Sequence, residues 1–255
     1  MSPPALLLAF DVSTPVGSIA LARGEELLAR EFLLQARDHA ARLLPGISAT
    51  LDRAGVSPRD LEGIVVGKGP GSFTGVRIAA ATARGLAIAL GIPLWPRSSL
   101  AAAAVSDGST LPEGVAGPIP GLAVEPGAGA PGRPRYILFD ARGDRVYGAC
   151  FKLGGERLEV LVRPHPATVG EVLSGRLPAG VLFAGSGALR HAATILESGH
   201  RLLLPPTGIP TAEGLLRLQA LSPDDSPERP GSRWEPDYLR GSWARRPTVG
   251  RTRSR

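Results

Sequence analysis

The stretch LLLAFDVSTPVGSIALARGEELLAREFLL, residues 6–34, decides the fold, because its pattern returns at residues 136–164 as YILFDARGDRVYGACFKLGGERLEVLVRP. Each copy reads as an apolar strand that ends in Phe-Asp, a polar turn, a second strand, a Gly-Glu hairpin and a third strand. Asp11 and Gly24 of the first copy correspond to Asp140 and Gly155 of the second at nearly the same spacing. The sequence therefore predicts an internal repeat that begins with an antiparallel meander.

Helices and a further strand follow the first copy. The apolar spacing predicts a helix that is capped by Asp38 and runs to about Ala54. A buried strand is expected over 61–67, and a second helix over 75–90, where Gly91 follows and stops it. The first lobe is thus predicted as a meander, a helix, a strand and a helix.

The second copy is followed by a shorter version of the same pattern. A short helix is predicted over 169–173, a strand over 180–184 and a helix over 188–196. We therefore expect an α/β fold of two lobes, each a mixed sheet with helices and the second lobe reduced. This arrangement resembles the two-lobed actin-like and sugar-kinase (ASKHA) superfamily, in which the aspartate turns of the two lobes face each other across a nucleotide.

Composition shifts divide the chain. Residues 106–134 are rich in Gly and Pro and are predicted to be a linker or a surface loop. The predicted units on either side are an N-terminal lobe over 1–105 and a smaller second lobe over 135–222. Residues 223–255 form a C-terminal segment that ends in a basic tail, predicted to be disordered. The tail holds six arginines with no acidic residue after Asp237: Arg240, Arg245, Arg246, Arg251, Arg253 and Arg255.

The overall composition excludes several classes of protein. Of the 255 residues 43% are hydrophobic and 20% are charged, which excludes disorder along the whole chain. The only cysteine, Cys150, leaves no intramolecular disulfide and no cysteine-ligated zinc site, as in a reducing compartment. No Lys or Arg precedes the first apolar run, and Asp11 interrupts that run early. We expect a cytoplasmic protein with no membrane segment, in which the net charge of +6 belongs to the tail.

The turn after the first strand is the first candidate site. Asp11, Ser13 and Thr14 could hold phosphate oxygens and order a magnesium-bound water. The alternative is that Asp11 and Ser13 satisfy the backbone of their own turn. The corresponding turn carries Asp140 but places Arg142 where an actin-like ATPase would want a small residue. That arginine argues against vigorous phosphate transfer.

The second candidate site is the glycine-rich string GKGPGSFTGVR over residues 67–77. Backbone amides of Gly69, Gly71, Ser72 and Gly75 could face an anion at the start of the following helix. The string matches neither the P-loop pattern nor G-x-G-x-x-G. A tight turn between a strand and a helix is therefore the alternative to a nucleotide phosphate site.

These motifs together resemble one family. The string GKGPGSFTGVRIAAATARGLA (67–87), the opening LLAFDVST (7–14), His39 to Pro45, the Asp140 turn and Pro236 to Arg240 are similar to the TsaB (YeaZ) family. The resemblance implies a non-catalytic paralogue of TsaD that binds TsaD as a heterodimer, with TsaE in a ternary complex. It implies a role in placing threonylcarbamoyl on the adenosine beside the anticodon of tRNA. It also implies tRNA contact mainly through the complex and a homodimer when TsaD is absent.

The resemblance also implies where a partner binds. The helices over 38–54 and 75–90 would form the interface, since the second helix carries small and apolar residues on more than one face. The alternative is a helix buried at the centre of its lobe, which would show the same sequence pattern. The predicted interface residues are His39, Leu43, Ile47, Val76, Ala80, Ala83 and Ala87.

The sequence predicts no catalytic residue and no metal site. The catalytic paralogue has two histidines four residues apart, whereas here Leu43 follows His39 at that spacing. A peptidase is not supported, because no H-E-x-x-H is present. No cofactor is expected to be required. The alternative function is an independent actin-like ATPase or kinase that binds ATP or ADP with Mg²⁺ between the lobes, in which case Asp11, Ser13, Thr14 and Asp140 would hold the nucleotide.

Overall fold

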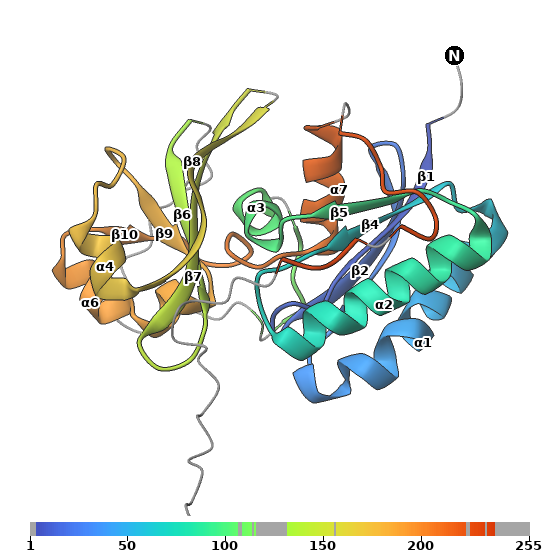
Figure 1. Cartoon of the computed structure of the whole chain (residues 1–255), viewed down its shortest axis with the longest axis horizontal. Coiled ribbons are helices and arrows are strands. Elements are labelled where there is room, and N and C mark those ends of the chain that lie inside the picture. The colour runs from blue at the N-terminus through green and yellow to red at the C-terminus, as the bar shows by residue number, and fades with distance from the viewer. Residues whose placement is uncertain are drawn as a thin grey trace, which may run out of the picture.

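The computed structural model describes residues 4–106, 109–113, 115, 132–155, 157–222, 225–232 and 234–237. Within them, two five-stranded mixed sheets stand side by side, with helices on their outer faces and between them (Figure 1). Most of the predicted 106–134 loop and all of the 238–255 tail lie outside the described residues.

The first sheet has the strand order β3-β2-β1-β4-β5. Its strands are β1 (Leu6–Asp11), β2 (Gly17–Arg23), β3 (Glu26–Leu33), β4 (Gly63–Gly67) and β5 (Leu94–Arg97). The first three form the predicted antiparallel meander, β4 lies parallel to β1, and β5 lies parallel to β4. We did not predict β5, because four residues that include a proline carry little strand signal.

The second sheet repeats this topology strand for strand, in the order β8-β7-β6-β9-β10. Its strands are β6 (Pro134–Asp140), β7 (Arg145–Gly154), β8 (Arg157–Thr168), β9 (Leu182–Ala184) and β10 (Arg201–Leu202). The hairpin glycines match as well, since Gly24 and Gly155 have φ angles of 60° and 58°. The internal repeat is therefore confirmed, and with it the two-lobed actin-like fold.

Two long helices, α1 (His39–Arg53) and α2 (Phe73–Leu90), cover the outer face of the first sheet. A 3-10 turn, η1 (Ala36–Asp38), precedes α1, and a second, η2 (Pro58–Asp60), lies between the two helices along the chain. Asp38 stands at the N-cap of α1, but its side chain makes no capping hydrogen bond, so the predicted carboxylate cap is wrong. Helix α2 begins before the predicted Gly75, because the Ser72 side chain accepts the Gly75 amide and caps it.

The middle layer consists of α3 (Ser99–Ala104) and α7 (Ala212–Ala220). Helix α3 ends the predicted first lobe but packs on β6 and β7, and α7 ends the predicted second lobe but packs on β1, β2, β4 and β5. The range 135–222 is thus not a separate packing unit. The reason is that both inner sheet faces are apolar, and the small alanines of these helices let them fit between.

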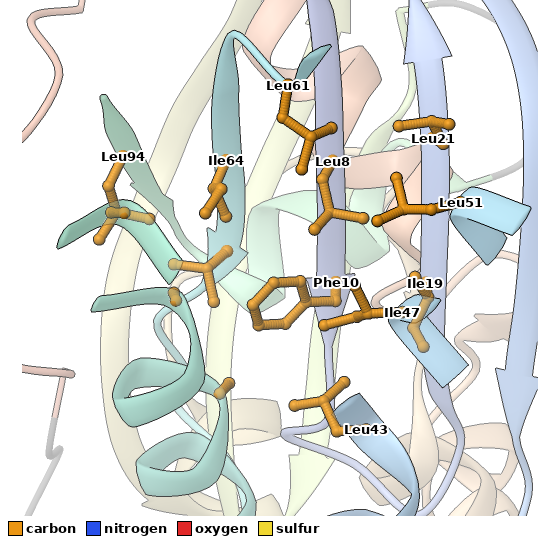
Figure 2. Close-up of a cluster of buried hydrophobic side chains, with 14 of the residues drawn as sticks. Leu8, Phe10, Ile19, Leu21, Leu43, Ile47, Leu51, Leu61, Ile64 and Leu94 are labelled. Carbon is orange, nitrogen blue, oxygen red and sulfur yellow. The ribbon is translucent and has the colours of Figure 1, made fainter. Parts of the chain in front are cut away.

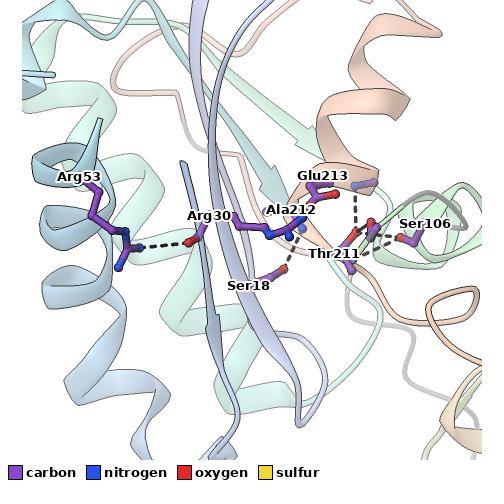
Figure 3. A network of polar contacts seen from close by, with 9 residues as sticks. Ser18, Arg30, Arg53, Ser106, Thr211, Ala212 and Glu213 are labelled. Atoms are coloured by element: carbon purple, nitrogen blue, oxygen red, sulfur yellow. Dashed lines mark hydrogen bonds and ion pairs between the residues drawn. The ribbon is translucent and has the colours of Figure 1, made fainter. Parts of the chain in front are cut away.

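Polar contacts fix α7 on the first sheet (Figure 3). The Ala212 amide donates to Ser18 Oγ of β2 at 2.7 Å, and Arg30 of β3 pairs with Glu213 at 2.8 Å. Buried Thr211 caps α7, and its hydroxyl lies 3.1 Å from that of Ser106, two residues after the end of α3. The crossing between the lobes is therefore held by satisfied polar groups.

Three short helices cover the outer face of the second sheet: α4 (Val169–Ser174), α5 (Ser186–Arg190) and α6 (Ala192–Glu197). The helix predicted over 188–196 is two helices, which meet at His191.

The C-terminal segment 225–237 returns to the first lobe. Glu228 forms a β-bridge with Leu94, so the segment runs along the edge of β5. At its end the Asp237 amide donates to the Lys68 carbonyl at 2.9 Å, and the two side chains pair at 3.1 Å. The part of the predicted C-terminal segment that precedes the basic tail is thus anchored beside the glycine-rich string.

Candidate functional site

The β1–β2 turn holds Asp11 inside the protein. Asp11 is fully buried, and its Oδ1 accepts the Ser13 amide at 2.7 Å. Its Oδ2 accepts the hydroxyl of Ser99, the first residue of α3, at 2.6 Å. Burial raises the pKa of Asp11 above its ordinary value, although the hydrogen bonds from Ser13 and Ser99 oppose that shift. Both oxygens of this carboxylate are therefore used by the protein's own donors.

The second lobe repeats this turn with different donors. Asp140 Oδ1 accepts the Arg142 amide at 3.0 Å, the same two-residue turn that Asp11 makes with Ser13. Asp140 Oδ2 pairs with Arg190 of α5 at 2.8 Å, and the Asp140 amide donates to Ser186 Oγ. Both aspartate turns hold their own backbone, as the structural alternative predicted.

The glycine-rich string between β4 and α2 directs much of its backbone inward. The Lys68 amide donates to the Arg97 carbonyl at 2.8 Å, and the Gly69 amide donates to Ser99 Oγ at 3.1 Å. The Ser72 amide donates to the Ser13 carbonyl at 2.7 Å. The string therefore binds the aspartate turn directly, and these three amides already have partners.

Three glycines make this close contact between string and turn feasible. A Cβ atom on Gly67 would overlap the Asp11 carboxylate, and one on Gly71 would overlap the Ser13 carbonyl oxygen. A Cβ atom on Gly75 would overlap the carbonyl oxygen of Val12. The glycines thus serve close backbone packing here. Among the predicted phosphate ligands, Thr14 Oγ1 donates to the Val16 carbonyl, whereas Ser13 Oγ is buried with no hydrogen-bond partner in the described residues.

Sequence reasoning missed Ser99, which connects Asp11 to the glycine-rich string. Its hydroxyl donates to Asp11 and accepts from Gly69. The two serines before the apolar run Leu100 to Ala104 are a helix-start signal that could have revealed it. The distant partner Asp11 could not be predicted from that signal.

The predicted interface residues are buried inside the first lobe, and this corrects the prediction. Leu43 and Ile47 of α1 point toward the sheet, where they join Phe10 in the core (Figure 2). His39 is buried too, and its Nε2 lies 3.2 Å from the Leu33 carbonyl oxygen. The buried α2 residues of the prediction are Val76, Ala80, Ala83 and Ala87. The apolar stripes read from the sequence are therefore the inner faces of the two helices.

The outer faces of α1 and α2 carry large apolar side chains of their own. Leu44 on α1 is 53% exposed, and Phe73 and Ile88 on α2 are 46% and 56% exposed. The exposed residues between Phe73 and Ile88 on α2 are Thr74, Arg77, Ala81 and Gly85, and the Arg77 guanidinium lies 3.7 Å from the centre of the Phe73 ring. We call Leu44, Phe73, Ala81, Gly85 and Ile88 the outer apolar face. It is a candidate surface for a partner.

Helix α2 also meets a simple test for a membrane span. By length and composition alone, Phe73–Leu90 is long and apolar enough to cross a membrane. Its mean hydropathy is 1.3, and 33% of the helix is buried inside the protein. Core helices of water-soluble proteins pass the same test, and here the small residues of α2 pack on the first sheet.

The described residues contain no group of three or more His, Cys, Asp or Glu side chains placed to hold a metal ion. His39 is turned inward on α1, and Leu43, one helical turn later, is in the core.

Cys150 is a buried thiol in β7, and we predict that it is unreactive in the folded protein. Burial raises its pKa to about 12, because the apolar surroundings disfavour the thiolate that reacts. A thiol reagent such as Ellman's reagent at about pH 8 should modify one thiol per chain in denaturant and essentially none without it. Rapid modification of the folded protein would contradict this.

Comparison with known proteins places the chain in a family. A family model described as "TsaD: tRNA N6-adenosine threonylcarbamoyltransferase" matches residues 27–195, more than half of the chain. The solved structure "YeaZ from Pseudomonas aeruginosa" is similar over 92% of this chain and 100% of its own, with a TM-score of 0.72 and 28% identity. Curated relatives named "tRNA threonylcarbamoyladenosine biosynthesis protein TsaB" are 43% identical over 99 residues in Haemophilus influenzae and 40% over 94 residues in Bacillus subtilis. The chain belongs to the TsaB (YeaZ) family.

The sequence likeness to the curated TsaB proteins is local. The alignments cover 38% and 37% of this chain and 41% of each relative, so the chain spans about two fifths of the length of the relatives it matches. The likeness to the Pseudomonas structure extends over both lobes.

Proposed function

We propose that this chain is a non-catalytic subunit in the biosynthesis of threonylcarbamoyladenosine on tRNA, and that it binds a TsaD protein through the outer apolar face. The observation that carries the proposal is the set of half-exposed Leu44, Phe73 and Ile88 on two adjacent helices. Phe73 and Ile88 lie near the two ends of α2, and exposed apolar side chains along such a helix surface are typical of a docking site for another protein. Membership in the TsaB family supports the pathway, since curated relatives carry that role in their names.

The hydrogen bonding of the two aspartate side chains supports a role without catalysis. A nucleotide site would need open oxygens to order magnesium, whereas Asp11 has both oxygens bonded to Ser13 and Ser99. Asp140 is likewise bonded to Arg142 and Arg190. We therefore favour a subunit that needs no nucleotide over the alternative of an independent ATPase or kinase.

Charging the outer apolar face should break the association. In Ile88→Glu, a carboxylate would have to enter an apolar contact without a partner, and affinity for the cognate TsaD should fall about 30-fold or more. The matched control is Val160→Glu on β8, where the original side chain is 51% exposed and lies on the other lobe. Titration by calorimetry would compare the variants. Equal affinity of Ile88→Glu and the unchanged chain would overturn the proposed interface.

Activity tests the role itself. Formation of threonylcarbamoyladenosine on tRNA would be followed with TsaD, TsaE and a threonylcarbamoyl-adenylate source, with and without this chain. We expect formation to require the chain, and to be lost in Ile88→Glu but kept in Val160→Glu. Magnesium-dependent ATP hydrolysis by the chain alone that is abolished in Asp11→Asn would instead establish the alternative ATPase.

A further inference from the structure

The second lobe has a cavity of about 380 Å³ where three connections of its sheet meet. Arg133, just before β6, lies on one side, and the loop over 177–181 before β9 forms the wall. Residues 199–201, which lead into β10, close it. We call this the Arg133 cavity. Its elements β9 and β10 lie at the opposite end of the molecule from α1 and α2, so a partner on the outer apolar face would leave it open (Figure 1).

The lining of the Arg133 cavity is cationic. It contains Arg133, His200 and Arg201, and no aspartate or glutamate. Arg133 Nη2 donates to the Gly180 carbonyl at 3.2 Å, which holds the guanidinium at the cavity wall. The His200 ring packs at 5.3 Å on the buried ring of Phe183, which orients it. The Arg133 side chain and the His200 ring thus have defined positions.

Bare backbone completes the wall. Gly180 and Gly199 both line the cavity at positive φ, 66° and 78°. At either position an added Cβ atom would meet nothing within 4 Å, so open space lies beside the backbone. A ligand could therefore approach the main chain closely at these two glycines.

A neighbouring cavity provides a comparison. It measures about 450 Å³ and shares Leu177 with the first, but it is lined by both Arg176 and Glu171. Its opposite charges oppose a strong anion there, while Arg176 adds positive charge next to the Arg133 cavity. The observations therefore favour an anion in the Arg133 cavity and not in its neighbour.

We propose that the Arg133 cavity binds a phosphate group through Arg133 and Arg201. The guanidinium fork matches two phosphate oxygens, and the volume lies in the usual range for ligand sites. The phosphate can come from an RNA backbone or from a small phosphorylated molecule. The RNA source rests on the proposed function in tRNA modification, and the small-molecule source does not.

The test uses the full chain with two probes, inorganic phosphate and an unmodified tRNA transcript. The cavity variant is Arg133→Gln with Arg201→Gln. The matched control is Arg157→Gln with Arg163→Gln, which removes the same charge from exposed positions on β8 that line neither cavity. The 238–255 tail is present in every variant, so its contribution is common to all. A third variant, Arg133→Lys with Arg201→Lys, retains the charge.

We expect the cavity variant to bind at least one probe about tenfold more weakly than the control, and the lysine variant to recover part of the loss. Weaker binding of both probes by the cavity variant would assign a site for free phosphate. Weaker binding of tRNA alone would assign the RNA backbone as the source. The slope of log K against log salt concentration should then be shallower by about 1 to 2. Equal weakening in cavity and control variants, or no binding of either probe, would overturn the proposal. Titration with TsaD separates the two proposals, since the cavity variant should bind TsaD normally.

Discussion

Gly75→Ala is expected to lower the free energy of unfolding by about 2–4 kcal/mol. Alanine is ordinarily the better helix residue, so the opposite sign would be expected at an exposed helical position. Gly75 lies in the first turn of α2, however, and a Cβ atom there would overlap the Val12 carbonyl oxygen of the aspartate turn. A backbone oxygen cannot move aside as a flexible side chain can. The string and the turn would therefore have to separate.

Gly85→Ala is the control in the same helix. A Cβ atom at Gly85 meets nothing within 4 Å, so the substitution should raise the free energy of unfolding by about 0.5–1 kcal/mol. Urea or thermal unfolding followed by circular dichroism would measure both variants. Equal effects of the two substitutions would show that the glycine-rich string is not packed on the aspartate turn as described.

Asp11→Ala should destabilise the protein by about 1–3 kcal/mol at neutral pH, because the Ser13 amide and the Ser99 hydroxyl lose their buried acceptor. Asp11→Asn has nearly the same shape, and its amide can still accept from Ser13. The asparagine variant should therefore be more stable than Asp11→Ala, although its amide nitrogen donates where Asp11 Oδ2 accepts from Ser99.

The pH dependence gives the sign of the Asp11 contribution. The pKa of Asp11 is raised in the folded state by burial, so the folded chain holds this proton more tightly than the unfolded chain. As pH rises above about 4, the unfolded state loses the proton first, and folding stability falls relative to Asp11→Asn until the folded pKa is passed. Unfolding free energies of both proteins across that range would measure the difference. If the free energy of unfolding instead rose with pH relative to Asp11→Asn, the raised pKa of a buried Asp11 would be contradicted.

Local pattern was sufficient for the repeated meander and for the two helices beside the first sheet. The apolar runs, the polar turn and the Gly-Glu hairpin within residues 6–34 and 136–164 predict strands and their antiparallel pairing. Gly24 and Gly155 mark the hairpins because the turn needs a positive φ. The antiparallel part of each sheet thus follows from signals within a few residues, together with the repeat, whereas β5 did not.

The candidate site depended on contacts that no local pattern contains. Apolar spacing on α1 and α2 predicted which residues share a face, but not whether that face meets the sheet or a partner. Leu43, Ile47 and Ala83 proved to be core, which left Leu44 and Ile88 outside. Glycines at 67, 71 and 75 fit a phosphate loop or a packed turn equally well, and only the position of residues 11–13 against them shows that the turn is packed.

Residue order along the chain therefore specified the two meanders, the helices beside the first sheet, the repeat and the family of this protein, because those follow from short-range periodicity and from recognisable strings. Tertiary structure decided which side of each helix is exposed, that α3 and α7 form a shared layer between the sheets, and that Ser99 holds Asp11. It also gathered Arg133 and Arg201 in one cavity. The physical reason is that burial and hydrogen bonding between distant residues depend on where whole elements pack, and sequence spacing does not encode those distances.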